Sequence, residues 1–121
     1  MEKVAGKIEN ANVYRISELF RKRPRGVGIG LTDAVVIEAK TEDGREIKET
    51  MYCRLKADGT FTTSVIGHNI RGKQERIANF IKYYKLAENV KGYNIREKIS
   101  EWKGKEVKIV PYKDGGYIYV P

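Results

Sequence analysis

The stretch "AVVIEAKTEDGREIKETMYCRL", residues 34–55, predicts a β-hairpin around which the other elements can be arranged. Apolar and charged residues alternate on both sides of "TEDG", and Gly44 can adopt the left-handed conformation that a tight turn requires. A loop of three residues, 42–44, places the apolar positions of both strands on one face. A two-residue Asp-Gly turn would mix the faces, so the sequence favours the longer loop.

The three-residue loop gives the hairpin one apolar and one polar face. The apolar face consists of Val35, Ile37, Ala39, Ile47, Met51 and Cys53. The polar face consists of Glu38, Lys40, Lys48, Thr50, Tyr52 and Arg54. Glu49 is the one charged residue that falls among the apolar positions.

Strands are predicted on both sides of this hairpin. Residues 3–16 read as a strand that is bulged around residues 10–12, and the first hairpin strand is expected to begin at Gly26. Residues 105–121 read as a second hairpin that turns around residues 114–116. One face of it carries Val107, Ile109, Pro111, Ile118 and Val120, and the other carries Lys108, Val110, Tyr112, Tyr117 and Tyr119.

Two helices are predicted between the hairpins. The first is long, is capped by Asn69 and has an apolar face made of Ile70, Ile77, Phe80, Ile81 and Tyr84. The second begins at Asn94, where Glu97 can complete a capping box, and it ends before Gly104. Its apolar face consists of Ile95, Ile99 and Trp102.

Composition predicts a single domain over residues 1–121 with an acidic partner. The net charge is +8 and the pI about 9.6, which suits nucleic acid or a membrane surface better than a neutral metabolite. Residues 32–60 carry a charge of −2 between two basic segments, so a sided molecule is expected. The lone Cys53 and the lack of a signal sequence or apolar span favour a cytoplasmic protein. Abundant Lys and Glu with a single Gln is typical of thermophiles.

No catalytic or cofactor motif is recognisable, so neither an enzyme nor a cofactor is expected. Gly26, Gly28 and Gly30 lead into a strand, whereas a phosphate cradle for a nucleotide would lead into a helix. The only cysteine and histidine that could act together are Cys53 and His68, but Cys53 is on the predicted core face. His68, beside Gly67, is more simply a loop or capping residue.

Cations and tyrosines instead indicate a binding surface. "FRKRPRGVGIGL", residues 20–31, presents Arg21, Lys22, Arg23 and Arg25 beside glycines that leave room for a nucleic-acid backbone, although a solvated turn is the alternative. The tyrosines of the C-terminal hairpin could stack on bases, or they could be core residues packed under the helices.

The order of three strands, a helix and two strands resembles the OB-fold, an α+β family with a five-stranded Greek-key barrel and a helix between strands three and four. The second short helix departs from the simplest pattern. The resemblance implies binding of single-stranded nucleic acid, DNA ahead of RNA, across the second and third strands and two flanking loops. The expected site is Arg21, Lys22, Arg23, Arg25, Lys48, Tyr52, Arg54, Lys108, Tyr112, Lys113, Tyr117 and Tyr119.

A second interpretation is a protein-interaction or assembly module with a basic surface. In that case a sheet edge, or the face of Ile95, Ile99 and Trp102, would dock on a protein partner or on another copy of the chain. No membrane partner is expected in either interpretation.

Overall fold

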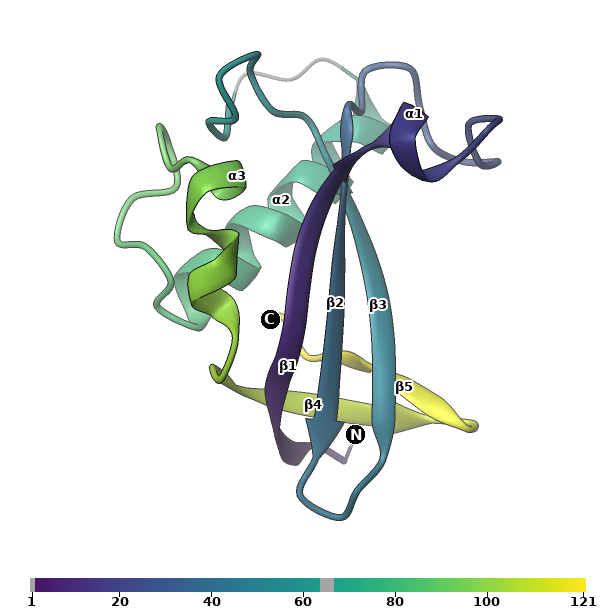
Figure 1. Cartoon of the computed structure of the whole chain (residues 1–121), viewed down its shortest axis with the longest axis vertical. Coiled ribbons are helices and arrows are strands. Elements are labelled where there is room, and N and C mark those ends of the chain that lie inside the picture. The colour runs from purple at the N-terminus through teal and green to yellow at the C-terminus, as the bar shows by residue number, and fades with distance from the viewer. Residues whose placement is uncertain (1, 64–66) are drawn as a thin grey trace.

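Five antiparallel strands curl into a nearly closed barrel in the computed structural model, which describes residues 2–63 and 67–121 (Figure 1). The strands are β1 (Val4–Arg15), β2 (Asp33–Thr41), β3 (Glu46–Cys53), β4 (Glu106–Tyr112) and β5 (Gly115–Ile118), in the order β3-β2-β1-β4-β5. The helices are α1 (Ile16–Leu19), α2 (His68–Tyr83), α3 (Ile95–Lys98) and the 3-10 helix η1 (Ile99–Trp102). The predicted fold class, an α+β OB-like barrel, is confirmed.

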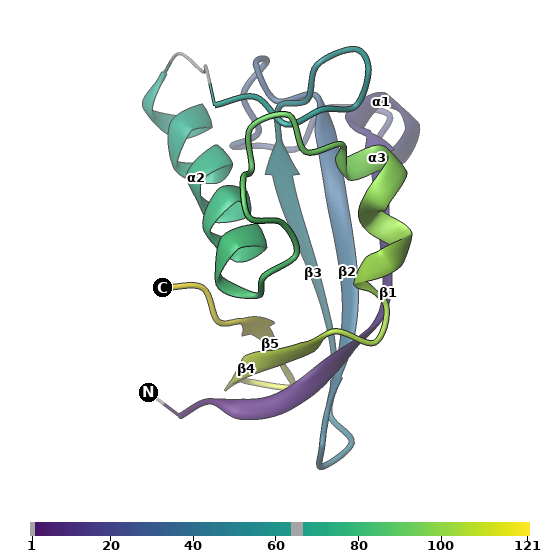
Figure 2. The same cartoon turned by 90° about the vertical axis from the view of Figure 1, so that its left-hand side faces the viewer.

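Strand β1 is long and bent, and it joins the two halves of the barrel (Figure 2). Its residues from Gly6 to Arg15 pair with β2, and those from Val4 to Lys7 pair with β4. At Gly6 an added Cβ would lie 2.7 Å from the carbonyl oxygen of Lys40, so only glycine fits this close approach. The pairing with β2 shifts between Ile8 and Asn10, so Glu9 is the extra residue of a bulge. The bulge therefore lies one residue before the predicted range of 10–12.

The β2–β3 hairpin has the predicted three-residue loop. Lys40 pairs with Glu46 and Ala39 with Ile47, and the amide of Thr41 donates to the carbonyl of Arg45 at 2.8 Å. Gly44 has a φ of +93°. The prediction that β2 begins at Gly26 is wrong: residues 24–31 form two consecutive turns, closed by hydrogen bonds from Val27 to Pro24 and from Leu31 to Gly28, both 3.1 Å.

Glu49, the misfit of the hairpin, closes the barrel between its two end strands. Its carboxylate accepts a hydrogen bond from the amide of Ile118 in β5 at 2.8 Å and forms an ion pair with Arg76 of α2 at 2.6 Å. Arg76 also donates to the carbonyl of Ile118 at 3.1 Å. Side chains of β3 and α2 therefore hold β5 in place at the seam of the barrel.

Gln74 of α2 binds the backbone of the residue that follows β3. Its amide oxygen accepts from the Arg54 N–H at 2.7 Å, and its amide nitrogen donates to the Arg54 carbonyl at 2.8 Å and to the Thr62 carbonyl at 2.7 Å. Gln74 is buried, and these bonds satisfy its polar atoms. The chain thus aligns α2 along the seam through polar contacts.

Helices α2 and α3, together with η1, contribute the predicted apolar side chains to the core of the barrel. Those of α2 are Ile77, Phe80, Ile81 and Tyr84, and those of α3 and η1 are Ile95, Ile99 and Trp102. Helix α2 begins at His68 with Gly67 at its N-cap, so the predicted cap at Asn69 is wrong. The side chains of His68 and Asn69 lie outside the described part of the chain. In α3 the predicted cap is confirmed, because the Asn94 side chain accepts from the Glu97 amide at 3.1 Å.

The β4–β5 hairpin turns through Lys113 and Asp114, one residue earlier than predicted. Tyr112 pairs with Gly115 and Ile109 with Ile118, and Lys113 has a φ of +54°. The predicted faces are unchanged, since both turns join residues of the same parity. The face that carries Lys108 and the tyrosines therefore points out of the barrel.

Candidate nucleic-acid interface

The basic loop, residues 20–32 between α1 and β2, carries four exposed cations, of which three have no partner in the described part of the chain. Arg21, Lys22 and Arg25 are exposed, and no hydrogen bond or ion pair engages their side chains within residues 2–63 and 67–121. Arg23 differs, because its guanidinium donates to the carbonyls of Gly28 at 2.9 Å and Leu31 at 2.8 Å. Three cations are thus available for a ligand, while the fourth shapes the loop.

A small apolar cluster fastens the basic loop to the barrel. It contains the buried residues Ile16, Val27 and Leu31, with Phe20, Tyr52 and Ile70 packed against them. The loop runs so close to α2 that a Cβ on Gly30 would collide with Ile70 Cδ1. The loop therefore has a defined conformation that the barrel supports.

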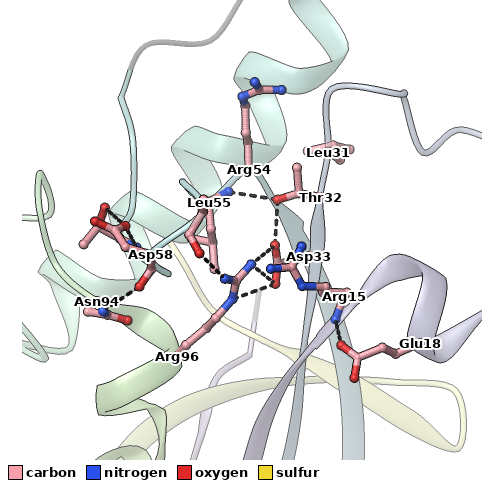
Figure 3. Close-up of polar contacts among 12 residues, drawn as sticks. Arg15, Glu18, Leu31, Thr32, Asp33, Arg54, Leu55, Asp58, Asn94 and Arg96 are labelled. Atoms are coloured by element: carbon pink, nitrogen blue, oxygen red, sulfur yellow. Dashed lines mark hydrogen bonds and ion pairs between the residues drawn. The ribbon is translucent and has the colours of Figure 1, made fainter.

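The three predicted residues of β3 and its end have different surroundings. Lys48 is exposed on the outer face of the barrel. Tyr52 is half-buried, and its ring centroid lies 6.5 Å from that of Phe20. The guanidinium of Arg54, which points away from the Asp33 network in Figure 3, donates to the Gly30 carbonyl at 3.0 Å. Tyr52 and Arg54 therefore support the basic loop, whereas the side chain of Lys48 has no hydrogen bond or ion pair with the described residues.

The tyrosine face is the outer surface of the β4–β5 hairpin, and its rings are accessible. Tyr112 is 61% exposed and Tyr117 is 36% exposed. The ammonium group of Lys113 lies 5.3 Å from the centroid of the Tyr112 ring. The alternative that these rings are packed under the helices does not apply to Tyr112 and Tyr117.

Tyr119 lies at the other end of the tyrosine face, within a cluster of rings and amines. Its ring is 3.8 Å from the Lys3 ammonium and 5.8 Å from the Tyr83 ring centroid. Lys108 donates from Nζ to the Tyr83 hydroxyl at 3.2 Å. Tyr83 and Lys3 thus join the predicted Lys108 and Tyr119.

The hydroxyl of Tyr84 anchors this cluster to the core. It donates to the Tyr119 carbonyl at 2.6 Å and accepts from the Lys108 amide at 3.2 Å. Burial raises the pKa of the Tyr84 phenol above its ordinary value, so this group stays neutral at physiological pH. Strand β4 at Lys108 and the residue that follows β5, Tyr119, are therefore both tied to the C-terminal end of α2.

The basic loop and the tyrosine face lie at opposite ends of the barrel, with β3 running between them (Figure 1). Arg45, beside the β2–β3 loop, donates to the carbonyls of Lys113 and Gly115, both at 2.9 Å, and thereby braces the tip of the C-terminal hairpin. The structure thus does not bring all twelve predicted residues together. It separates a phosphate-binding candidate from a stacking candidate.

A groove of about 720 Å³ lies over β1, and Tyr83 and Lys108 line part of it. Lys7 and Lys40 contribute cations to its wall, but Glu9, Glu42 and Glu106 contribute as many anions as the three lysines contribute cations. The groove is therefore electrically balanced, unlike the basic loop, which has no carboxylate between residues 19 and 32.

The predicted docking face and the candidate Cys53–His68 pair both depend on side chains that are buried in the core. Ile95, Ile99 and Trp102 are buried in the chain's own interior, so the prediction that they form a docking face is wrong. Cys53 is fully buried, and burial raises the pKa of its thiol, which disfavours the reactive thiolate. Within the described residues there is no cluster of three His, Cys, Asp or Glu side chains suited to a metal ion. No helix there is long and apolar enough to cross a membrane.

Two neighbours of the tyrosine face, Tyr83 and Lys3, and one feature of the basic loop were not predicted from the sequence. Tyr83 lies off the apolar stripe of α2, and its place in the helical pattern could have predicted that its ring is exposed. Lys3 gave no signal because its contact with Tyr119 joins distant parts of the chain. Ile29 is 88% exposed, although Val27 and Leu31 on either side of it are buried.

The barrel and its exposed cations and rings define an OB-like α+β domain with a basic outer surface. Comparisons with models of protein families, with curated proteins and with solved structures found no match. The function of the chain therefore has to be argued from its own side chains.

Proposed function

We propose that this chain binds single-stranded nucleic acid, DNA ahead of RNA, without catalysing a reaction on it. The observation that carries the proposal is that the barrel exposes both kinds of group, with unneutralised cations in the basic loop at one end and accessible rings on the tyrosine face at the other. Tyr112 and Tyr117 offer flat faces to bases, and Arg21, Lys22 and Arg25 offer donors to phosphates.

Stacking and phosphate contacts suit a single strand more than an intact duplex. Rings can reach the faces of bases only where the bases are not stacked inside a helix, and stacking on tyrosine tolerates every base. The outer face of β3 with Lys48 lies between the two groups, so one strand could contact both. We therefore expect weak sequence preference and a strong dependence on salt.

Fluorescence anisotropy of labelled oligonucleotides at several salt concentrations tests the proposal. The triple variant Arg21→Ser, Lys22→Ser, Arg25→Ser should bind more weakly to every sequence, and its slope of log affinity against log salt should fall by about 0.7 per lost phosphate contact. Arg23 is kept because it holds the loop carbonyls. The matched control removes Lys91, Lys98 and Lys103, which are exposed around α3, and should change the slope little.

The tyrosines have a different signature. Tyr112→Ala and Tyr117→Ala should each weaken binding by roughly 1–3 kcal/mol if the ring stacks on a base, with the salt slope preserved. The mass in solution, with and without oligonucleotide, separates this function from the assembly module. A concentration-dependent oligomer that ignores DNA and RNA at low salt would end the proposal.

A further inference from the structure

Ile29 at the tip of the basic loop is an apolar side chain held in solvent. It is 88% exposed and occupies the turn that the hydrogen bond from Leu31 to Gly28 closes at 3.1 Å. An isoleucine normally contributes to a fold through burial, and this one contributes almost none. The stability of the fold therefore gives no reason for an isoleucine at this position.

Contacts on both sides of Ile29 fix its position. Arg23 binds the carbonyls of Gly28 and Leu31, and Arg54 binds the carbonyl of Gly30. The Leu31 side chain is fully buried, and Gly30 lies against Ile70 without room for a Cβ. The loop thus presents one apolar side chain from a preorganised turn, which lowers the entropy cost of binding.

From this geometry we infer that Ile29 is a wedge that enters between two neighbouring bases of the bound strand. The inference rests on the proposed function and names the part of the ligand that the basic loop contacts. Arg21, Lys22 and Arg25 lie in the same loop and would hold the phosphates on either side of the opened step. Isoleucine is among the side chains that serve as such wedges in DNA-binding proteins.

The size of the wedge determines which nucleic acid it can open. Burial of one isoleucine is worth about a ten- to hundred-fold change in affinity, and opening a step of an intact duplex costs a similar amount. The wedge therefore gains little on a duplex and gains most on a single strand or at its junction with a duplex. The same magnitude argues against a lipid ligand, because even a myristoyl chain gives only marginal membrane binding.

The test uses a single-stranded oligonucleotide that contains 2-aminopurine beside adenine, since the fluorescence of this base rises when it is unstacked. The wild-type chain should raise the fluorescence on binding. Ile29→Ser should bind about ten-fold more weakly with an unchanged salt slope, and should lose the fluorescence rise. Ile29→Phe should retain both. Because Ile29 is exposed, neither change should alter the unfolding midpoint followed through Trp102.

Leu19, an exposed aliphatic side chain on α1, provides the matched control, and Leu19→Ser should bind like the wild type. If the wild type binds and Ile29→Ser matches it in affinity and fluorescence, the wedge is overturned while the proposed function stands. Binding of the wild type to phosphatidylserine vesicles that Ile29→Ser abolishes, with oligonucleotide binding unaffected, would also overturn it. A wild type that binds no oligonucleotide at low salt overturns both.

Discussion

Arg96 of α3 donates hydrogen bonds from two nitrogens of its guanidinium to the buried carboxylate of Asp33 (Figure 3). Nη2 lies 3.0 Å from Oδ1, Nε lies 3.3 Å from Oδ2, and the Thr32 hydroxyl donates to Oδ1 at 2.6 Å. Asp33 is 1% exposed at the start of β2. This pair joins α3 to the same end of the barrel from which the basic loop emerges.

Removal of Arg96 should therefore destabilise the chain strongly. Arg96→Ala leaves the Asp33 carboxylate buried without its partner, and we expect a loss of about 3 kcal/mol in the free energy of unfolding. Urea denaturation followed by Trp102 fluorescence measures the change. Lys98→Ala is the control in the same helix, since the Lys98–Glu101 pair is exposed at 3.6 Å and should contribute about 0.5 kcal/mol or less. Equal effects of the two substitutions would contradict this assignment.

Glu49 should be needed to close the barrel. Glu49→Ala deprives the Ile118 amide and Arg76 of their acceptor, and we expect a loss of about 2 kcal/mol together with faster hydrogen exchange of the Ile118 amide. Glu46→Ala on the exposed face of β3 is the control. An Ile118 amide that exchanges at the wild-type rate in Glu49→Ala would show that the seam is held in another way.

Stability should fall at alkaline pH through two tyrosines, the buried Tyr84 and the partly buried Tyr93. Burial raises the pKa of Tyr84 and Tyr93, so each phenol holds its proton more tightly in the folded chain than in the unfolded one. Their contribution to stability is complete below the unfolded pKa of about 10 and is lost as the pH rises through the folded values. Unfolding free energies between pH 8 and 11 should show the decline, and Tyr84→Phe with Tyr93→Phe should flatten it. A decline that is just as steep in the double variant would refute the assignment.

Cys53 should be inert to thiol reagents in the folded chain. The side chain is fully buried and its pKa is raised, so modification requires an opening of the barrel. Ellman's reagent should react at least about 100-fold more slowly in buffer than in urea. A Ser100→Cys variant with Cys53→Ala provides an exposed thiol for comparison, and similar rates for Cys53 and this thiol would rule out the buried position.

Periodic features of the chain could be predicted from its sequence. The register of the β2–β3 hairpin followed from alternation, because a shift by one residue would have put Lys48 on the same face as Ile37 and Lys40 on the same face as Ile47. The apolar stripe of α2 and the Asn94 cap followed from residue types at fixed spacing. These elements gave the predicted succession of strands and helices along the chain, on which the resemblance to the OB-fold rested.

The candidate site was only partly predictable, because its shape depends on contacts between distant residues. Arg23 and Arg54 were predicted as ligand-binding cations, but their guanidiniums also bind carbonyls of the basic loop, and no local pattern specifies that geometry. The glycines were expected to begin a strand. Instead the anchoring of Val27 and Leu31 in the small apolar cluster folds them into turns.

Gln74 covers the backbone of Arg54 at the end of β3, a position where another chain could otherwise pair with the sheet. A strand edge with unpaired N–H and C=O groups is a template for pairing with other chains, and this is a common route to aggregation. The Gln74 amide occupies both backbone groups of Arg54, as a neighbouring strand would, while its own side chain cannot extend the sheet. We therefore expect this glutamine to hinder pairing of other chains with the end of β3.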